Sequence, residues 1–208
     1  MILTEVAAEE LPQLIEALGR QLAIRDRAVL ERIAATSPQR AVGETAQIHH
    51  QAAVALAQAF GMGVVASPPE QSFSWDGKTL TSQTEAYVLL HEVAHFQLSD
   101  PARRTVPDFG LGAGPDTGLR PEAEAVAQLF GLEREQEEAQ ASLLGIIWEV
   151  ELGQPALASF LDQNWLEGAA RQGTAEFFAK VLQALREGGF VTQDGRPTRR
   201  IRGEPDHE

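Results

Sequence analysis

The sequence contains no cysteine, which excludes disulfide bonds, thiolate metal sites and cysteine nucleophiles. Basic residues are also scarce, because 17 lysines and arginines stand against 30 aspartates and glutamates and the net charge is −13. This charge argues against nucleic acid or an anionic membrane as the main partner. No apolar run approaches the length of a membrane span. The first ten residues carry acids and no base, unlike a secretory signal, so we expect a cytoplasmic protein.

The remaining composition, 43% hydrophobic and 23% charged, is typical of a globular protein. Apolar residues recur at helical spacing, which predicts helices over residues 9–19, 20–35, 44–60, 83–100, 121–152, 156–170 and 174–187. Residues 72–81 predict a hairpin that turns at Asp76-Gly77. We therefore predict a predominantly helical α+β fold with one domain over residues 1–190. The Arg-rich residues 191–208 are expected to form a flexible tail.

The segment His91-Glu92-Val93-Ala94-His95 lies within the helix predicted over 83–100. Histidines at i and i+4 share one face of a helix, so both imidazoles can reach one ion. Glu92 stands beside that face, where it can contact a metal-bound water. Ser82 and Glu85 have the spacing of a capping box at the start of this helix. The pattern predicts a helical metal site, with a pair of partly buried, carboxylate-bonded histidines as the alternative.

A catalytic metal site usually has a third protein ligand and leaves positions open for water or substrate. Without cysteine, and with the other histidines far away in the sequence, a carboxylate is the natural third ligand. The candidates lie beyond the long loop 99–120 and are Glu122, Glu124, Glu133, Glu135, Glu137 and Glu138. A ligand must point into the protein, and the chain becomes apolar just after Glu138. Spacing alone does not separate Glu138 from Glu135, and Glu137 is a further alternative.

Further motifs follow the metal helix at defined intervals. Six residues separate His95 from Ala102-Arg103-Arg104, and three residues separate Arg104 from Asp108-Phe109-Gly110. Gly153-Gln154-Pro155 and the stretch from Asn164 to Gly168 come later. Over residues 84–168 the chain thus resembles the elongation factor P hydroxylase family, although the stretch between Gly110 and Glu138 is longer here. The resemblance implies a metallopeptidase-like, zincin-type fold, with the hairpin beside the metal helix, and assigns the third ligand to Glu138.

Two roles are possible for the motif residues Arg103, Arg104 and Asp108. The arginines can pair with Asp108 in a structural ion pair, or they can grip an acidic substrate. The resemblance favours a role near the substrate for all three residues.

Two chemistries suit the ligand set His91, His95 and Glu138. The resemblance implies an oxidoreductase that hydroxylates a modified lysine on elongation factor P, with Fe(II) as the ion and Glu92 as a proton relay. The same ligands are those of a gluzincin-like zinc metallopeptidase, in which Glu92 is the general base. A metal-bound interaction protein without catalysis is the third alternative. We expect one divalent ion, Fe(II) or Zn(II), and a protein or peptide substrate.

Overall fold

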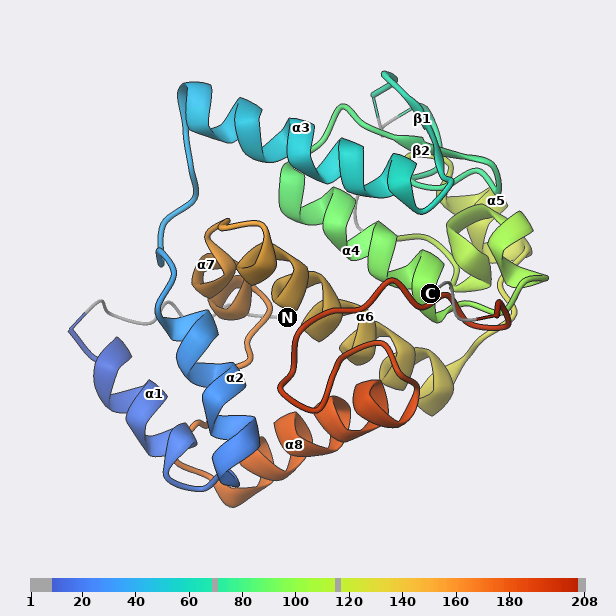
Figure 1. Cartoon of the computed structure of the whole chain (residues 1–208). Helices are drawn as coiled ribbons and strands as arrows, with labels where there is room; N and C mark the ends of the chain where they lie inside the picture. The colour runs from blue at the N-terminus through green and yellow to red at the C-terminus, as the bar shows by residue number, and fades with distance from the viewer. Residues whose placement is uncertain (1–8, 69–70, 115–116, 206–208) are drawn as a thin grey trace. The chain divides into compact units, whose positions relative to one another are not determined.

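The computed structural model describes residues 9–68, 71–114 and 117–205 (Figure 1). Its helices are α1 (Leu11–Gly19), α2 (Ile24–Ala34), α3 (Gly43–Ala59), α4 (Ala86–Leu98), α5 (Arg120–Ala125), α6 (Gly131–Glu151), α7 (Ala156–Asp162) and α8 (Gln172–Glu187). Two short 3₁₀ turns, η2 (Arg103–Thr105) and η3 (Pro107–Gly110), lie between α4 and α5. Strands β1 (Gly63–Val65) and β2 (Thr79–Thr81) pair in parallel. The protein is therefore mostly helical with a small sheet, as predicted for an α+β fold.

The chain divides into two compact units, and the single domain over residues 1–190 stays a prediction. The first unit contains the residues up to Ala41 and Ile146–Thr198, and the second contains Val42–Gly145 and the residues from Arg199 onwards. Helix α6 contributes to both units, because the division falls between Gly145 and Ile146. A continuous amphipathic pattern gives no sign of such a division, since it is the same on both sides of the boundary.

The Arg-rich C-terminal residues, for which a flexible tail over 191–208 was predicted, make backbone contacts in their described part. In the first unit, Val191 and Pro197 form an antiparallel bridge around a turn at Gly195. In the second unit, the backbone N–H of Arg202 donates to the carbonyl of Gln97 over 2.9 Å. In the first unit the N–H of Val191 also donates to the carbonyl of Leu185 in α8 over 3.4 Å, which ties the start of this segment to the helix before it. Residues 206–208 lie outside the described part of the chain.

In the second unit, α3 and α4 lie side by side, drawn cyan and green in Figure 1. Helix α3 ends as predicted, because Gly61 follows it with φ +80°, a conformation that glycine adopts without strain. No strand was predicted after this helix, but Gly63–Val65 form β1 on the parallel partner β2. Three residues are too few to show strand periodicity in the sequence.

The predicted hairpin over 72–81 is confirmed in its central part. Trp75 and Leu80 form an antiparallel bridge, and the N–H of Asp76 donates to the carbonyl of Thr79 over 3.1 Å. The ring of Trp75 packs edge-on against Phe96 of α4, with centroids 5.6 Å apart. The hairpin thus contacts the helix that carries the two histidines.

Helix α4 begins without the predicted capping box. Glu85 is the N-cap residue, and no side chain caps the helix. The hydroxyl of Ser82 donates instead to the carbonyl of Val65 over 3.1 Å, which ties the residues before α4 to β1. The side chain of Ser82, which the local pattern assigned to the start of α4, is therefore hydrogen-bonded to the sheet instead.

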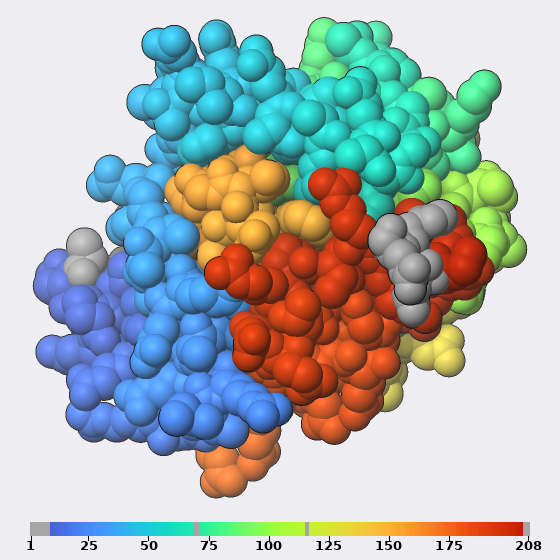
Figure 2. Space-filling view, viewed as in Figure 1, coloured from blue at the N-terminus to red at the C-terminus, as the bar shows by residue number. Residues whose placement is uncertain are grey.

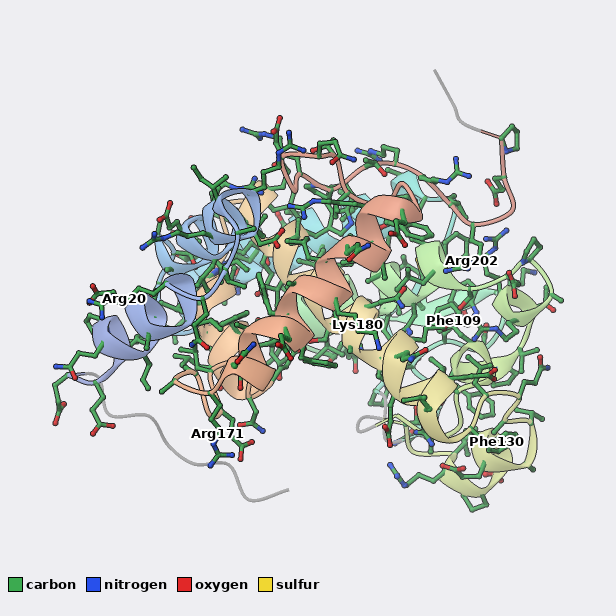
Figure 3. The ribbon with its side chains drawn as sticks, turned by 90° about the horizontal axis from the view of Figure 1, so that it is seen from below. Arg20, Phe109, Phe130, Arg171, Lys180 and Arg202 are labelled. Atoms are coloured by element: carbon green, nitrogen blue, oxygen red, sulfur yellow. The ribbon has the colours of Figure 1, made fainter. Side chains whose placement is uncertain are left out.

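The single long helix predicted over 121–152 is also wrong, because residues 126–130 separate α5 from α6. Gly131 opens α6 with φ +52°, a left-handed conformation that stops a helix from continuing through it. Phe130, 65% exposed, projects from this connection, as the side-chain view shows (Figure 3). The break allows α6 to take a direction independent of α5.

Helices α4 and α6 approach each other closely at Gly145. A Cβ atom at this position would lie 3.3 Å from both the backbone nitrogen and the Cα of His91. Ordinary contacts between carbon atoms are about 3.5–4.0 Å, so only glycine fits here without a shift. The glycine lies two turns after Glu138 on the same helix and sets its distance from α4.

The first unit is built from α1, α2, α7, α8 and the end of α6. Its fully buried side chains include Leu18, Leu30, Ile33, Phe160 and Phe178. Arg32 of α2 donates to the carbonyl of Asp194 over 3.0 Å, and the blue surface of α2 adjoins the red C-terminal residues in Figure 2. Buried Glu149 lies 3.5 Å from Arg40, whose guanidinium also donates to the hydroxyl of Ser159.

Candidate metal centre

The two histidines of the motif lie one turn apart on α4, as their spacing predicts. The Nε2 atoms of His91 and His95 are 3.0 Å apart, and the rings meet edge to face with centroids separated by 4.5 Å. His95 is buried, while the side chain of His91 is 26% exposed. Leu90, Val93 and Ala94 are fully buried on the remainder of the helix and fix it in the unit. The site therefore has one closed and one open side.

Glu138 of α6 completes a group of three ligands. Its Oε2 atom lies 3.5 Å from Nε2 of His91 and 3.4 Å from Nε2 of His95. Neighbouring ligands around a tetrahedral ion at zinc–nitrogen distances would be separated by roughly 3.3 Å. His91, His95 and Glu138 could therefore hold a metal ion, since their ligand atoms all lie within 4.8 Å of one another. Three ligands from two helices leave further coordination positions for water or substrate.

The other candidate carboxylates lie elsewhere. Glu122, Glu133 and Glu135 are exposed. Glu124 accepts a hydrogen bond from the N–H of Ala113 over 3.1 Å. Glu137 points to the opposite side of His95 from Glu138, with its Oε1 atom 3.9 Å from Nδ1. The geometry thus brings Glu138 to the two histidines and separates it from Glu135, which spacing alone did not achieve.

The electrostatics of the group suit a cation. Burial alone lowers the pKa of His95, but Glu138, Glu137 and Glu92 more than offset it and raise this pKa to about 10. Burial alone would raise the pKa of Glu138, whereas His95 and His91 lower it well below its usual range. A pocket that holds a proton so firmly on a buried imidazole also favours a divalent ion, whose binding would release that proton.

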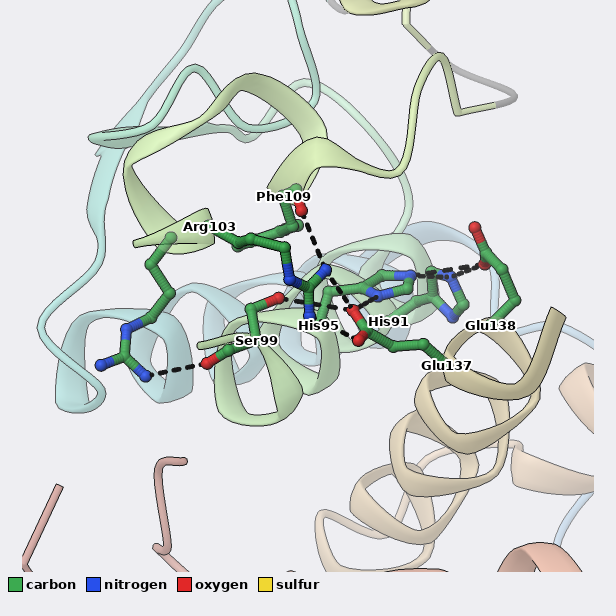
Figure 4. A network of polar contacts seen from close by, with 8 residues as sticks. His91, His95, Ser99, Arg103, Phe109, Glu137 and Glu138 are labelled. Atoms are coloured by element: carbon green, nitrogen blue, oxygen red, sulfur yellow. Dashed lines mark hydrogen bonds and ion pairs between the residues drawn. The ribbon is translucent and has the colours of Figure 1, made fainter. Parts of the chain in front are cut away.

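A second layer of polar contacts surrounds His95 (Figure 4). Arg103 donates from both terminal nitrogens to the two carboxylate oxygens of Glu137, one of the bonds being 3.0 Å long. Arg103 also donates to the carbonyl oxygen of Phe109 over 3.0 Å. Ser99 Oγ is at 3.5 Å from Glu137. The arginine therefore joins η3 to α6 behind the histidine.

Phe109 forms an aromatic wall of the site. Its ring stacks on His95 with centroids 5.8 Å apart, and on Trp75 with centroids 5.5 Å apart. Asp108 and Phe109 both have positive φ angles, 45° and 54°. Left-handed conformations at two successive residues other than glycine are strained and persist only where surrounding contacts hold them. This strained turn directs the ring of Phe109 onto His95.

Asp108 holds the strained turn from within. Its carboxylate accepts hydrogen bonds from the hydroxyl of Thr117 at 2.7 Å and from the backbone N–H of Trp75 at 3.2 Å. Burial raises the pKa of Asp108, and these hydrogen bonds only partly offset the effect. Asp108 thus connects the hairpin, through Trp75, to the loop that contains Thr117.

The ion pair that the sequence suggested between the arginines and Asp108 is wrong. Arg103 pairs with Glu137, and Arg104 pairs with Glu204 over 3.0 Å. Arg104 also donates to the carbonyls of Ser99 and Arg202. Both arginines are buried, so neither is placed to grip a substrate at the surface. The motif spacing drew attention to both arginines. Their partners, Glu137 of α6 and Glu204 of the C-terminal segment, are too distant in the sequence to be predicted from it.

Glu92 follows His91 on α4 and is only partly buried. The negative charge of its carboxylate is the smallest of the causes that raise the pKa of His95, after those of Glu138 and Glu137. The sequence analysis named Glu137 only as a possible metal ligand and did not name Ser99, so it missed the contacts of Glu137 with Arg103 and Ser99.

Comparisons of the chain with models of known families, with curated proteins and with solved structures found no match. Among the described residues, no helix is long and apolar enough to cross a membrane.

Proposed function

We propose that this protein is a metal-dependent enzyme whose ion is held by His91, His95 and Glu138. The proposal rests on the meeting of these three ligand atoms, within 4.8 Å of one another, from two helices far apart in the sequence. The centre consists of buried His95, partly exposed His91 and Glu138, whose carboxylate side chain is 40% exposed, so the ion would be reached from one side.

Among enzymes with this ligand set, we propose a hydroxylase similar to the elongation factor P hydroxylase family, which acts on a modified lysine of that translation factor. Support comes from the two motifs that carry the resemblance, since Arg103 and Phe109 both act on the surroundings of His95. Bound Fe(II) would supply the activation of oxygen in such a reaction. The chain itself would hold His95 in place, close the inner side of the centre to water, and move a proton through Glu92.

A zinc hydrolase of the metallopeptidase type is the second candidate, and the position of Glu92 favours it. A partly exposed carboxylate next to a metal ligand is suited to take a proton from water at the open side of the centre. Zn(II) would supply a bound water with a pKa lowered to about 7. Both candidates need the same three ligands and differ in the ion and the substrate.

The first experiment is to measure the metal content of protein purified anaerobically without a nickel column. His91→Ala is compared with His49→Ala, a histidine substitution outside the three-ligand group. Iron near one per chain, lost only in His91→Ala, supports the hydroxylase, and zinc with the same dependence supports the hydrolase. If no metal binds even after iron or zinc is added, the proposal is wrong.

Turnover is then tested with the substrate that each ion indicates. For iron, mass spectrometry should detect one added oxygen on the lysine of elongation factor P, and only in the presence of oxygen. For zinc, a peptide library should reveal cleavage. Glu92→Gln should abolish either activity and retain the metal, because Glu92 is not one of the three ligands. If Glu92→Gln retains full activity, Glu92 has no role in proton transfer, and a metal-bound protein without either activity would be an interaction protein.

A further inference from the structure

The two ring nitrogens of His95 face different carboxylates. Nε2 lies 3.4 Å from Glu138 and 3.0 Å from Nε2 of His91, so it is the atom that faces the ion. Nδ1 is buried and lies 3.9 Å from Oε1 of Glu137, too far for a hydrogen bond. Within the described residues Nδ1 has no hydrogen-bond partner.

Leaving a buried ring nitrogen without a hydrogen-bond partner is unfavourable in free energy. When an ion takes Nε2 of a histidine, the proton resides on Nδ1, and metal-bound histidines almost always donate that N–H to a carboxylate, a carbonyl or water. Glu137 is the carboxylate that faces Nδ1, and a movement of about 1 Å would bring the pair to hydrogen-bonding distance.

Glu137 is held in this place from behind. The fork of Arg103 binds both of its carboxylate oxygens, and a two-pronged contact of this kind fixes orientation as well as position. Arg103 is itself anchored to the carbonyl of Phe109, whose ring stacks on His95. The side chains of Arg103 and Glu137 are 9% and 13% exposed, so water competes little for these bonds.

We propose that Glu137 is a positioning residue that orients His95 toward the ion, and that Arg103 fixes Glu137 for this task. The inference rests on the proposed function, because it requires an ion bound through His95. Glu138 would then bind the ion directly, and Glu137 would orient His95, which is another ligand of the same ion. An ordinary structural ion pair between Arg103 and Glu137 would instead leave the metal affinity unchanged.

The first test measures Zn(II) affinity by competition with a chromogenic chelator. Glu137→Gln should bind zinc about 10–100-fold more weakly than the wild type, the usual effect of losing such a partner. Glu135→Gln is the matched control, since it removes the same charge from an exposed position on the same helix and should bind as tightly as the wild type. Equal affinities of Glu137→Gln and the wild type would overturn the inference.

Arg103→Lys separates orientation from charge. Lysine keeps the positive charge but cannot form the fork, so this variant should also bind zinc more weakly if Glu137 must be fixed. Arg103→Lys also serves if Glu137→Gln fails to fold, as judged by circular dichroism. Wild-type affinity in a folded Arg103→Lys protein would refute the role of Arg103.

The second test observes the hydrogen bond itself. In ¹⁵N-labelled, zinc-loaded wild type, the Nδ1–H proton of His95 should give a slowly exchanging NMR signal far downfield. Glu137→Ala should lose this signal, while Glu135→Ala should keep it. An unchanged signal in Glu137→Ala would overturn the inference.

The two proposals can fail separately. If zinc binds equally well to the wild type and His91→Ala, or binds to neither, the proposed function fails and this inference fails with it. If zinc binds through His91 but is indifferent to Glu137, the metal centre stands and the positioning role alone is refuted.

Discussion

Glu137 and Glu138 are consecutive residues of α6, yet they face opposite nitrogens of the same histidine. Oε2 of Glu138 lies 3.4 Å from Nε2 of His95, and Oε1 of Glu137 lies 3.9 Å from Nδ1. Successive side chains on a helix point about 100° apart, so two neighbours can pass on either side of a ring that stands between them. One turn of α6 thereby places a carboxylate near each ring nitrogen of His95.

Binding of Zn(II) should stabilise the folded chain. An ion at 100 times its dissociation constant adds about 2.7 kcal/mol to the free energy of unfolding. For a chain of this length, this corresponds to a rise of roughly 5–10 °C in melting temperature. Thermal melts in zinc and in a chelator, followed by circular dichroism, measure the shift. His49→Ala should behave as the wild type, and an equal shift in His91→Ala would contradict binding at this site.

The stability of the first unit should depend on pH through Glu149. Burial raises its pKa to about 7, although Ser159 and Arg40 oppose the shift. The folded state therefore holds a proton that the unfolded chain, with an ordinary pKa near 4.3, releases earlier. The contribution of Glu149 is greatest below about pH 4 and declines as the pH rises to about 7, by about 3 kcal/mol in total.

Glu149→Gln should remove this decline. Urea unfolding at pH 5 and pH 8 compares the variant with the wild type and with Glu151→Gln, a more exposed glutamate on the same helix. The wild type and the control should lose stability between the two pH values, and Glu149→Gln should lose much less. An identical loss in all three proteins would show that Glu149 does not titrate in this range.

Gly145→Ala should weaken the metal centre. The added methyl group would lie 3.3 Å from the backbone of His91 and push α4 away from α6. Alanine gains about 1 kcal/mol in helix propensity, while overpacking costs typically 1–3 kcal/mol, so we expect a net destabilisation of about 1 kcal/mol and weaker zinc binding. Gly173→Ala, in α8 with open space around its Cβ, is the control and should be neutral or stabilising. Unchanged zinc affinity in Gly145→Ala would show that the helices adjust without cost.

Asp108→Ala should destabilise the protein by about 1–3 kcal/mol, because the N–H of Trp75 and the hydroxyl of Thr117 would lose their buried acceptor. Asp108→Asn should retain most of the stability, since asparagine offers one acceptor and one donor and tolerates a positive φ. Chemical unfolding measures both. If the two variants are equally unstable, the negative charge rather than the hydrogen bonds holds the turn.

The parts of the centre that the sequence predicted are those that depend on local spacing. His91 and His95 share a helix face because they are four residues apart, and Glu138 stands at the edge of an apolar stripe, where a side chain can be partly buried. The helix end at Gly61 follows in the same way from one residue type. The zincin-type fold that the family resemblance implied stays a prediction.

The remaining features depend on partners distant in the sequence. Ser82 was expected to cap α4, but β1 offered a carbonyl that no local pattern reveals. Arg103 was expected beside Asp108, five residues away, but Glu137 reaches it from α6. The break before Gly131 was missed because residues 126–130 continue an unremarkable helical composition.

His95 and Glu138, neighbours in space, are 43 positions apart in the chain. An ion between them would close a long loop, as a disulfide does in other proteins, in a chain that has no cysteine with which to make one. Unlike a disulfide, this cross-link would form and open with the concentration of the ion and with acid. The fold of the second unit would then respond to the supply of metal around it.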